Sequence, residues 1–268
     1  MASKLPSKDA GEKPDLSAYP TWLSRHHDVD IQGERGRYMA TADAAKRVIE
    51  ASTFWQNYKR NRRDLDDQYQ MKSKGYLLFA SPEDDDIHVK SWSSFIEKNW
   101  RKNVVTNMKW PSAPDGGWTL PDTWYQTTND IVRTTLVVKY LDGVEALLAG
   151  LASIANESGS DFESSMEARD EGYYAAHSYT HHMVPALQKD WKTLEVPISF
   201  EVQITTQLQE VIRRLTHEEY DKRRKTAPGS SAKWQWDYAG PSFKPNYLGH
   251  ILHYMEGLIM EVRNRDNG

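Results

Sequence analysis

The chain has 268 residues, which is near the upper size of a single hydrophobic core, so we expect one domain with terminal extensions. Its 34 basic and 38 acidic residues give a net charge of -4, so any contact with nucleic acid has to come from a local basic surface. The lack of cysteine excludes disulfide scaffolds, thiolate zinc sites and cysteine nucleophiles.

Neither export nor membrane spanning is indicated. No stretch of the sequence approaches the eighteen or so uninterrupted apolar residues of a membrane span, and the start has no apolar signal-peptide core. A cysteine-free chain of this kind is expected in the reducing cytoplasm.

Residues 1–40 mix proline, glycine and charges of both signs without periodicity, which predicts a poorly ordered N-terminal arm. A helical pattern begins at Thr41, with apolar residues near a 3.6-residue period. The helix becomes basic between Lys59 and Lys74, where a solvated face is favoured over a binding surface.

Strand and helix patterns alternate through the central part of the chain. Polar–apolar alternation and β-branched runs predict strands, and 3.6-residue periodicity predicts helices. The predicted order is a turn and helix at 88–103, a strand at 131–138, a helix at 141–156, strands at 177–184 and 195–204, and an amphipathic helix at 205–224. This order predicts an α/β (α+β) fold, a mixed β-sheet flanked by helices.

A segment rich in proline, glycine and serine at 226–232 predicts a linker, followed by a final helix from about Tyr247 to Val262. The apolar stripe of this helix can pack on the core or dock a partner or a second protomer, and packing on the core is favoured. We therefore divide the chain into an arm at 1–40, a central domain at 41–225, and a linker with a C-terminal helix at 226–268.

Two carboxylates lie at strand positions in different parts of the chain. Asp130 directly precedes the strand at 131–138, and Glu201 lies inside the strand at 195–204. An acidic side chain within a β-branched strand is costly unless it holds a cation or pairs with a base. The two can hold Mg²⁺, which prefers oxygen ligands. Alternatively, Asp130 caps a turn and Glu201 forms a salt bridge with an arginine.

Short motifs accompany these carboxylates with a characteristic spacing. GYYAAH (172–177) and EVQITT (201–206) are followed by His217, sixteen residues after Glu201. The pattern resembles the synthetase domain of RelA/SpoT-like alarmone synthetases, in which an Asp opens a strand and G-Y-x-x-x-H, E-[IV]-Q-I-x-T and a helical His follow. The resemblance covers residues 41–225. Within the family, the chain is similar to the small, single-domain group.

An upstream element adds to this resemblance. Lys90, Ser94 and Lys98 match the nucleotide-gripping R-x-K-x-x-x-S-x-x-x-K element of the family. His88 stands where the family usually has the Arg that contacts adenine, and Thr205 replaces the usual Arg of the E-x-Q-I-R-T strand. Ordinary handling of donor and acceptor is therefore left open.

The resemblance implies a nucleotidyltransferase-like synthetase fold with helical N- and C-terminal extensions, and a pyrophosphokinase that uses ATP and Mg²⁺. Such an enzyme moves the β,γ-pyrophosphate of ATP to a ribose 3′-hydroxyl and releases AMP. The implied catalytic residues are Asp130, Glu201, Arg133 and His177, of which Asp130 and Glu201 hold the metal. The implied ATP-binding residues are His88, Lys90, Ser94, Lys98 and Arg101, and the implied acceptor-binding residues are Gly172, Tyr173, Gln203 and His217.

Tyr173 would stack on the acceptor base. His177 and His217 can bind phosphate or ribose, or they can be structural residues.

The acceptor is a second open question. Small members of the family make guanosine or adenosine tetra- and pentaphosphates, or are toxins that pyrophosphorylate the 3′-CCA end of tRNA. Asp170 and Glu171 stand where alarmone makers usually carry Lys, Arg or Asn, and two carboxylates would repel a compact polyphosphate. Basic patches would suit the phosphates of an RNA, and tryptophans between them could stack on its bases. The tryptophans are Trp55, Trp92, Trp100 and Trp110.

These features favour tRNA over GDP, GTP, ADP or ATP as the acceptor. A third hypothesis is an inactive member that binds nucleotide or RNA. An active enzyme would be toxic, by stopping translation or draining purine nucleotides, so a neutralising antitoxin protein is expected as a partner. Oligomerisation through the final helix is compatible with its apolar stripe.

Overall fold

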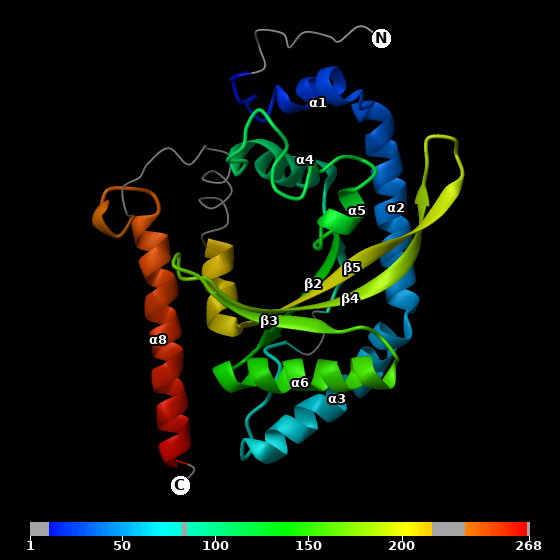
Figure 1. Cartoon of the computed structure of the whole chain (residues 1–268). Coiled ribbons are helices and arrows are strands. Elements are labelled where there is room, and N and C mark those ends of the chain that lie inside the picture. The colour runs from blue at the N-terminus through cyan, green and yellow to red at the C-terminus, as the bar shows by residue number, and fades with distance from the viewer. Residues whose placement is uncertain (1–10, 82–84, 216–233, 267–268) are drawn as a thin grey trace, which may run out of the picture.

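The protein contains a five-stranded sheet with mixed strand directions (Figure 1). The computed structural model describes residues 11–81, 85–215 and 234–266. The strand order is β1-β2-β5-β4-β3; β2 and β5 are parallel, and the other neighbouring pairs are antiparallel. The strands are β1 (His88–Val89), β2 (Val132–Val138), β3 (Glu163–Ala168), β4 (Tyr174–Leu187) and β5 (Thr193–Thr206).

Helices lie on both sides of this sheet, which confirms the predicted fold class (Figure 1). The side-chain oxygens of Asp30, Ser52 and Ser91 cap the starts of three of them, α2, α3 and α4. The helices are α1 (Tyr19–His27), α2 (Ile31–Ala51), α3 (Thr53–Lys72), α4 (Trp92–Trp100), α5 (Trp124–Thr127), α6 (Leu141–Glu157) and α8 (Phe243–Asp266).

The two faces of the sheet differ in polarity, because successive side chains of a strand point to opposite faces. On one face, Leu136 and Ile204 are fully buried, and Phe200 packs edge-on against Trp55 of α3 with ring centroids 5.4 Å apart. Figure 1 shows α3 and α6 on one side of the sheet and α4 and α5 on the other. The opposite face carries Arg133, His177, Tyr179, Glu201 and Gln203.

The N-terminal segment is more ordered than its composition predicts. Residues 19–27 and 31–51 form α1 and α2, whereas the sequence predicted an extended or partly ordered arm up to residue 40. Tyr19 and Leu23 are fully buried, and Asn103 donates a hydrogen bond to the Tyr19 hydroxyl at 2.7 Å. These tertiary contacts stabilise the helices, and local composition does not reveal them.

The sequence did not predict β3. This strand is polar and largely exposed, and it pairs with β4 at the edge of the sheet. A strand with no buried face lacks the apolar alternation by which strands are identified in a sequence.

α8 packs on the domain through polar side chains. Asn246, Glu256 and Arg263 are buried, whereas Ile251 and Met255 of the predicted apolar stripe are 55% and 43% exposed. The prediction that this stripe faces the core is therefore wrong for these two residues, while its leucines are half-buried. Glu256 and Arg263 join the helix to the domain through a hydrogen bond to Thr206 and an ion pair with Asp142.

Two of the tryptophans considered for RNA stacking are core residues. Trp55 and Trp100 are 3% and 5% exposed, so the interpretation as stacking surfaces is wrong for both. Trp92 packs against Trp124, and Trp110 is half-buried.

The helix predicted at 205–224 is seen over residues 207–215, and its remainder lies outside the described residues. Within the described ranges, no helix combines the length and the hydropathy that crossing a membrane requires.

Candidate active site

Strand register brings the predicted catalytic residues together on the polar face of the sheet. Arg133 of β2 lies opposite Glu201 of β5, and Glu201 lies opposite Tyr179 of β4. Gln203, two residues further along β5, lies opposite His177. Residues from three separate strands thus form two adjacent rows, and a ligand on this face can contact all of them.

A chain of hydrogen bonds ends on Glu201. Gln203 Nε2 donates to the Tyr173 hydroxyl at 2.6 Å, and this hydroxyl lies 3.0 Å from His177 Nε2. His177 Nδ1 lies 2.8 Å from Glu201 Oε1. With a neutral imidazole protonated on Nδ1, every link has one donor and one acceptor. The chain holds the Glu201 carboxylate, which is only 7% exposed, in a fixed position.

Tyr179 is a residue of this cluster that sequence reasoning missed. Its hydroxyl donates to Glu201 Oε1 at 3.1 Å. Burial raises the pKa of Tyr179, and the negative charges of Glu201, Glu167 and Asp130 raise it further. Tyr179 therefore stays protonated and donates to the carboxylate. Its position two residues after His177 on a strand was the available signal, since i and i+2 share a face.

Asp130 forms ion pairs with two lysines predicted to bind ATP. Its Oδ1 lies 2.7 Å from Lys98 Nζ, and its Oδ2 lies 2.9 Å from Lys90 Nζ. Burial would raise the pKa of Asp130, but the charges of Lys98 and Lys90 outweigh burial and hold this pKa well below its usual value. Asp130 is therefore ionised throughout the physiological pH range.

The cluster around Asp130 contains more lysines than carboxylates. Lys90 is buried, and burial lowers its pKa while the charge of Asp130 partly offsets the change. Lys102, which the sequence did not assign to the site, donates to the carbonyl of Thr127, and burial followed by the charge of Lys98 lowers its pKa. Three lysines thus gather around one aspartate at the start of β2.

The other predicted ATP-binding residues lie around the same corner. Ser94 is exposed in the first turn of α4, where the Ser91 hydroxyl donates to its hydroxyl at 3.0 Å. Arg101 Nε lies 3.9 Å from Glu97, and His88 is exposed on β1 opposite Arg133.

Gly172 has a packing role in the structure. Its φ of 78° is left-handed, and a Cβ there would lie 2.5 Å from the carbonyl oxygen of Asn246 and 3.0 Å from the backbone nitrogen of His250. A Cβ on Gly249 would likewise meet the Gly172 backbone. The turn before Tyr173 therefore touches the backbone of α8, which only glycine permits.

The Asp170 side chain is held by hydrogen bonds from two residues of the segment that precedes α8. Its carboxylate accepts from Trp234 Nε1 at 3.2 Å and from Gln235 Nε2 at 3.1 Å, and its backbone oxygen lies 2.9 Å from His250 Nε2. Glu171 is exposed. Because both donors are neutral, Asp170 keeps its negative charge, and its effect on an acceptor stays a prediction.

Two further positions singled out in the sequence are His217 and Thr205. His217 lies outside the described residues. Thr205 is 4% exposed, opposite Val137 on the same face of the sheet as Gln203.

The donor chemistry of Asp130 and Glu201 suits Mg²⁺, because both present carboxylate oxygens. In the part of the chain that the structure describes, no group of three or more His, Cys, Asp or Glu side chains could hold a metal ion. Mg²⁺ commonly takes one or two protein carboxylates and completes its shell with water and substrate phosphates. By donor chemistry the two carboxylates suit an ion that binds together with a nucleotide, and in the structure both oxygens of Asp130 pair with lysines.

Comparison with known proteins gave matches to structures alone. No family model matches the sequence, and no curated protein matches it. Small alarmone synthetase 1 from Bacillus subtilis bound to AMPCPP is 14% identical with a TM-score of 0.50, and the match covers 89% of this chain and 99% of that chain. The same enzyme bound to its product pppGpp gives 13% identity, a TM-score of 0.50, and coverage of 80% and 95%.

A GTP pyrophosphokinase family protein from Streptococcus pneumoniae also matches, with 15% identity, a TM-score of 0.48, and coverage of 86% of this chain and 91% of that chain. The two matches to the Bacillus enzyme extend over most of both chains and agree with the family indicated by the sequence motifs. The protein therefore has the RelA/SpoT-like synthetase fold of the small alarmone synthetases.

Proposed function

We propose that the protein is an ATP-dependent pyrophosphokinase that transfers the β,γ-pyrophosphate of ATP to a ribose 3′-hydroxyl. The observation that carries this proposal is the position of Glu201, held by His177 and Tyr179 in the row beside Arg133 on the polar face of the sheet. The fold shared with small alarmone synthetases supports it, since one such enzyme is described as bound to AMPCPP and to its product pppGpp.

The lysines around Asp130 would bind the ATP phosphates. Lys98 lies on α4 and Lys90 immediately precedes this helix, and together they give a concentrated positive charge at the start of β2. Ser94 and Arg101 add a hydroxyl and a guanidinium on the same helical stretch. Such a set of donors suits polyphosphate oxygens and fixes the direction of the chain of phosphates.

Glu201 is placed to remove the proton of the attacking hydroxyl. In the transfer, a bond forms between the 3′-oxygen and the β-phosphorus, and the bond between the β-phosphorus and the oxygen bridging it to the α-phosphorus breaks. AMP leaves with that oxygen, and the hydroxyl proton passes to Glu201. His177 and Tyr179 both contact Oε1, so they orient the carboxylate for this step.

Asp130 and Glu201 would also hold Mg²⁺ with the nucleotide. The chemistry that the ion supplies when bound is neutralisation of the negative charge on the phosphate oxygens. Arg133, directly opposite Glu201, would add a positive charge on the same row.

We propose the 3′-CCA end of tRNA as the acceptor. The basic composition of residues 88–109 favours this choice. This segment contains Lys90, Lys98, Arg101, Lys102 and Lys109 against Glu97 alone. In that case the protein is a translation toxin, and a neutralising antitoxin is its expected partner.

A free purine nucleotide is the second candidate acceptor. The fold shared with a small alarmone synthetase that is described as bound to its product pppGpp favours it. An alarmone synthetase that makes (p)ppGpp or (p)ppApp would use this acceptor.

Radiolabel transfer separates the two acceptors. Purified protein, Mg²⁺ and γ-labelled ATP would be incubated with deacylated tRNA in one sample and with GDP, GTP, ADP or ATP in others. We expect label on tRNA, lost when the 3′-CCA is removed beforehand. Label confined to a nucleotide would establish the alarmone synthetase, and no label on any acceptor would contradict the pyrophosphokinase proposal.

Two substitutions at Tyr173 separate stacking from hydrogen bonding. Tyr173→Phe keeps the ring but removes the hydroxyl that joins Gln203 to His177. If Tyr173 acts mainly by stacking on the acceptor base, the Phe variant keeps most activity and Tyr173→Ala loses 1–3 kcal/mol of acceptor binding, roughly a 5- to 150-fold rise in acceptor KM. A fall in kcat in both variants, with KM unchanged, would assign the role of Tyr173 to the hydrogen-bonded chain instead.

A further inference from the structure

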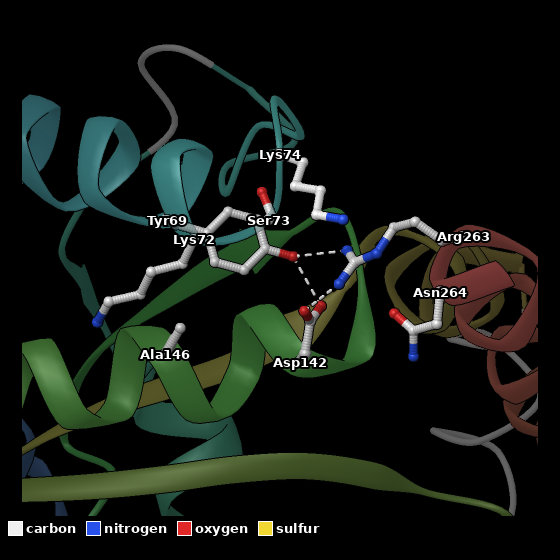
Figure 2. A pocket seen from close by; sticks show the side chains of 8 residues that line it. All are labelled: Tyr69, Lys72, Ser73, Lys74, Asp142, Ala146, Arg263 and Asn264. Atoms are coloured by element: carbon white, nitrogen blue, oxygen red, sulfur yellow. Dashed lines mark hydrogen bonds and ion pairs between the residues drawn. The ribbon is translucent and has the colours of Figure 1, made fainter. Parts of the chain in front are cut away.

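A second basic cavity lies away from the active site, on the side of the sheet that α3 and α6 cover. Its volume is about 380 Å³, within the range of roughly 300–1,000 Å³ that is usual for small-molecule sites. It lies between the end of α3, the start of α6 and the end of α8 (Figure 2). Its lining residues are Tyr69, Lys72, Ser73, Lys74, Asp142, Ala146, Arg263 and Asn264.

The charge of this lining is mainly positive. It contains Lys72, Lys74 and Arg263, and Asp142 is the one acidic residue among the lining side chains of the described chain. Asp142 pairs with Arg263. Among the residues that the structure describes, no carboxylate pairs with Lys72 or Lys74. The cavity therefore has two basic groups in excess.

Arg263 is built into this site. It is 6% exposed, its guanidinium donates to the Tyr69 hydroxyl at 2.9 Å, and the rings of Tyr76 and Tyr140 flank it at 4.9 and 5.0 Å. Its Nε atom is buried without a hydrogen-bond partner in the described structure. A buried donor without a partner is costly, and an added acceptor would satisfy it.

The backbone places Lys74 beside this arginine. Lys74 has a φ of 60°, a left-handed conformation that favours glycine, and Gly75 follows with a φ of 109°. Figure 2 shows the Lys74 side chain turned toward Arg263, while Lys72 extends to the other side of the cavity. Asp142 pairs with Arg263, so Lys74 leaves this group with a net positive charge, which a bound anion would neutralise.

We propose that this cavity is a second anion site, which binds a small molecule carrying a phosphate group. Guanidinium and ammonium groups are typical donors to phosphate oxygens, and Arg263, Lys72 and Lys74 supply them here. The ligand would join the end of α3 to the end of α8. Because α8 also packs against Gly172, beside Tyr173, the same ligand would hold α8 against the acceptor side of the active site.

Hydrogen–deuterium exchange tests the site without any need for turnover. The full chain would carry Glu201→Gln to prevent catalysis, and inorganic pyrophosphate would be added with a chelator. At a pyrophosphate concentration ten times Kd, amide hydrogen exchange in the segments that form the site should slow about tenfold. We expect this slowing in residues 69–76 and 258–266, separately from any change at 88–102 in the ATP site.

Two lysine variants localise the effect. Lys74→Ala removes an exposed side chain and should abolish the slowing at 258–266, while Lys192→Ala, an exposed lysine in the turn between β4 and β5, should leave it intact. Unchanged exchange at 258–266 on adding pyrophosphate, or slowing that persists in Lys74→Ala, would overturn the proposal. AMP in a parallel sample distinguishes the sources: tighter binding than pyrophosphate identifies a nucleotide, and weaker binding identifies free phosphate.

Discussion

Replacing Glu201 by glutamine is expected to lower the rate of pyrophosphate transfer at least about 10³-fold, because the variant loses both a general base and a metal ligand. The fold should be retained. Glutamine has the same shape, and its side-chain oxygen can still accept from His177 and Tyr179. Initial rates with labelled ATP, together with thermal unfolding of both proteins, measure the two effects.

Glu163→Gln is the matched control for this variant. Glu163 lies opposite Tyr179 on β3, in the same row as Glu201, but it is exposed. The substitution removes one negative charge from the same face and should change the rate less than about twofold, since exposed charges are well screened. Wild-type activity in Glu201→Gln would contradict the assignment of Glu201 to both roles.

Replacing Asp130 by asparagine is expected to lower both activity and stability. The carboxylate compensates the charges of Lys90 and Lys98, whose side chains are 7% and 23% exposed. Removing one partner of a buried ion pair leaves an uncompensated charge, at a cost of about 3 kcal/mol, or a Tm lower by roughly 6–12 °C. Differential scanning calorimetry and the transfer assay measure the two losses.

The pH dependence of stability provides a second measurement on the same variant. The folded-state pKa of Asp130 lies below its ordinary value of 3.8, because the two lysines stabilise the ionised form. The carboxylate therefore contributes stability above about pH 4, and this contribution is lost as the pH falls through the lower, folded-state pKa. The stability of Asp130→Asn should fall less steeply than that of the wild type below about pH 4.

A compensating substitution separates the two roles of Asp130. Lys90→Met added to Asp130→Asn removes the more deeply buried of the unpaired charges, and Tm should recover by several degrees. Transfer activity should not recover, because the double variant lacks both the proposed metal ligand and one of the lysines proposed to bind ATP. Recovery of activity would show that Asp130 serves only to pair with lysine.

The sequence predicted an element or a site residue best where a single short segment contains the whole pattern that identifies it. The strands β2, β4 and β5 were predicted because β-branched and alternating residues fill them. Asp130, His177 and Glu201 followed from motif spacing, and the register of β4 and β5 then brings His177 within hydrogen-bond distance of Glu201.

Contacts between segments that are distant in the chain could not be predicted from the sequence. The ion pairs of Asp130 join residues 32 and 40 positions apart, and Tyr179 reaches Glu201 only through the register of two strands. The burial of Tyr19 and the engagement of Asp170 depend on tertiary contacts in the same way. Neither local composition nor periodicity contains this information.

The contact between Gly172 and α8 has a consequence for the order in which the site is completed during synthesis. The sheet and its catalytic carboxylates precede α8 in the chain, so the ribosome makes them first. The turn that leads to Tyr173 can contact Asn246 and Gly249 only after α8 has been made and has folded. A nascent chain therefore carries the two proposed catalytic carboxylates before this turn is fixed, and full activity would wait until α8 has left the ribosome.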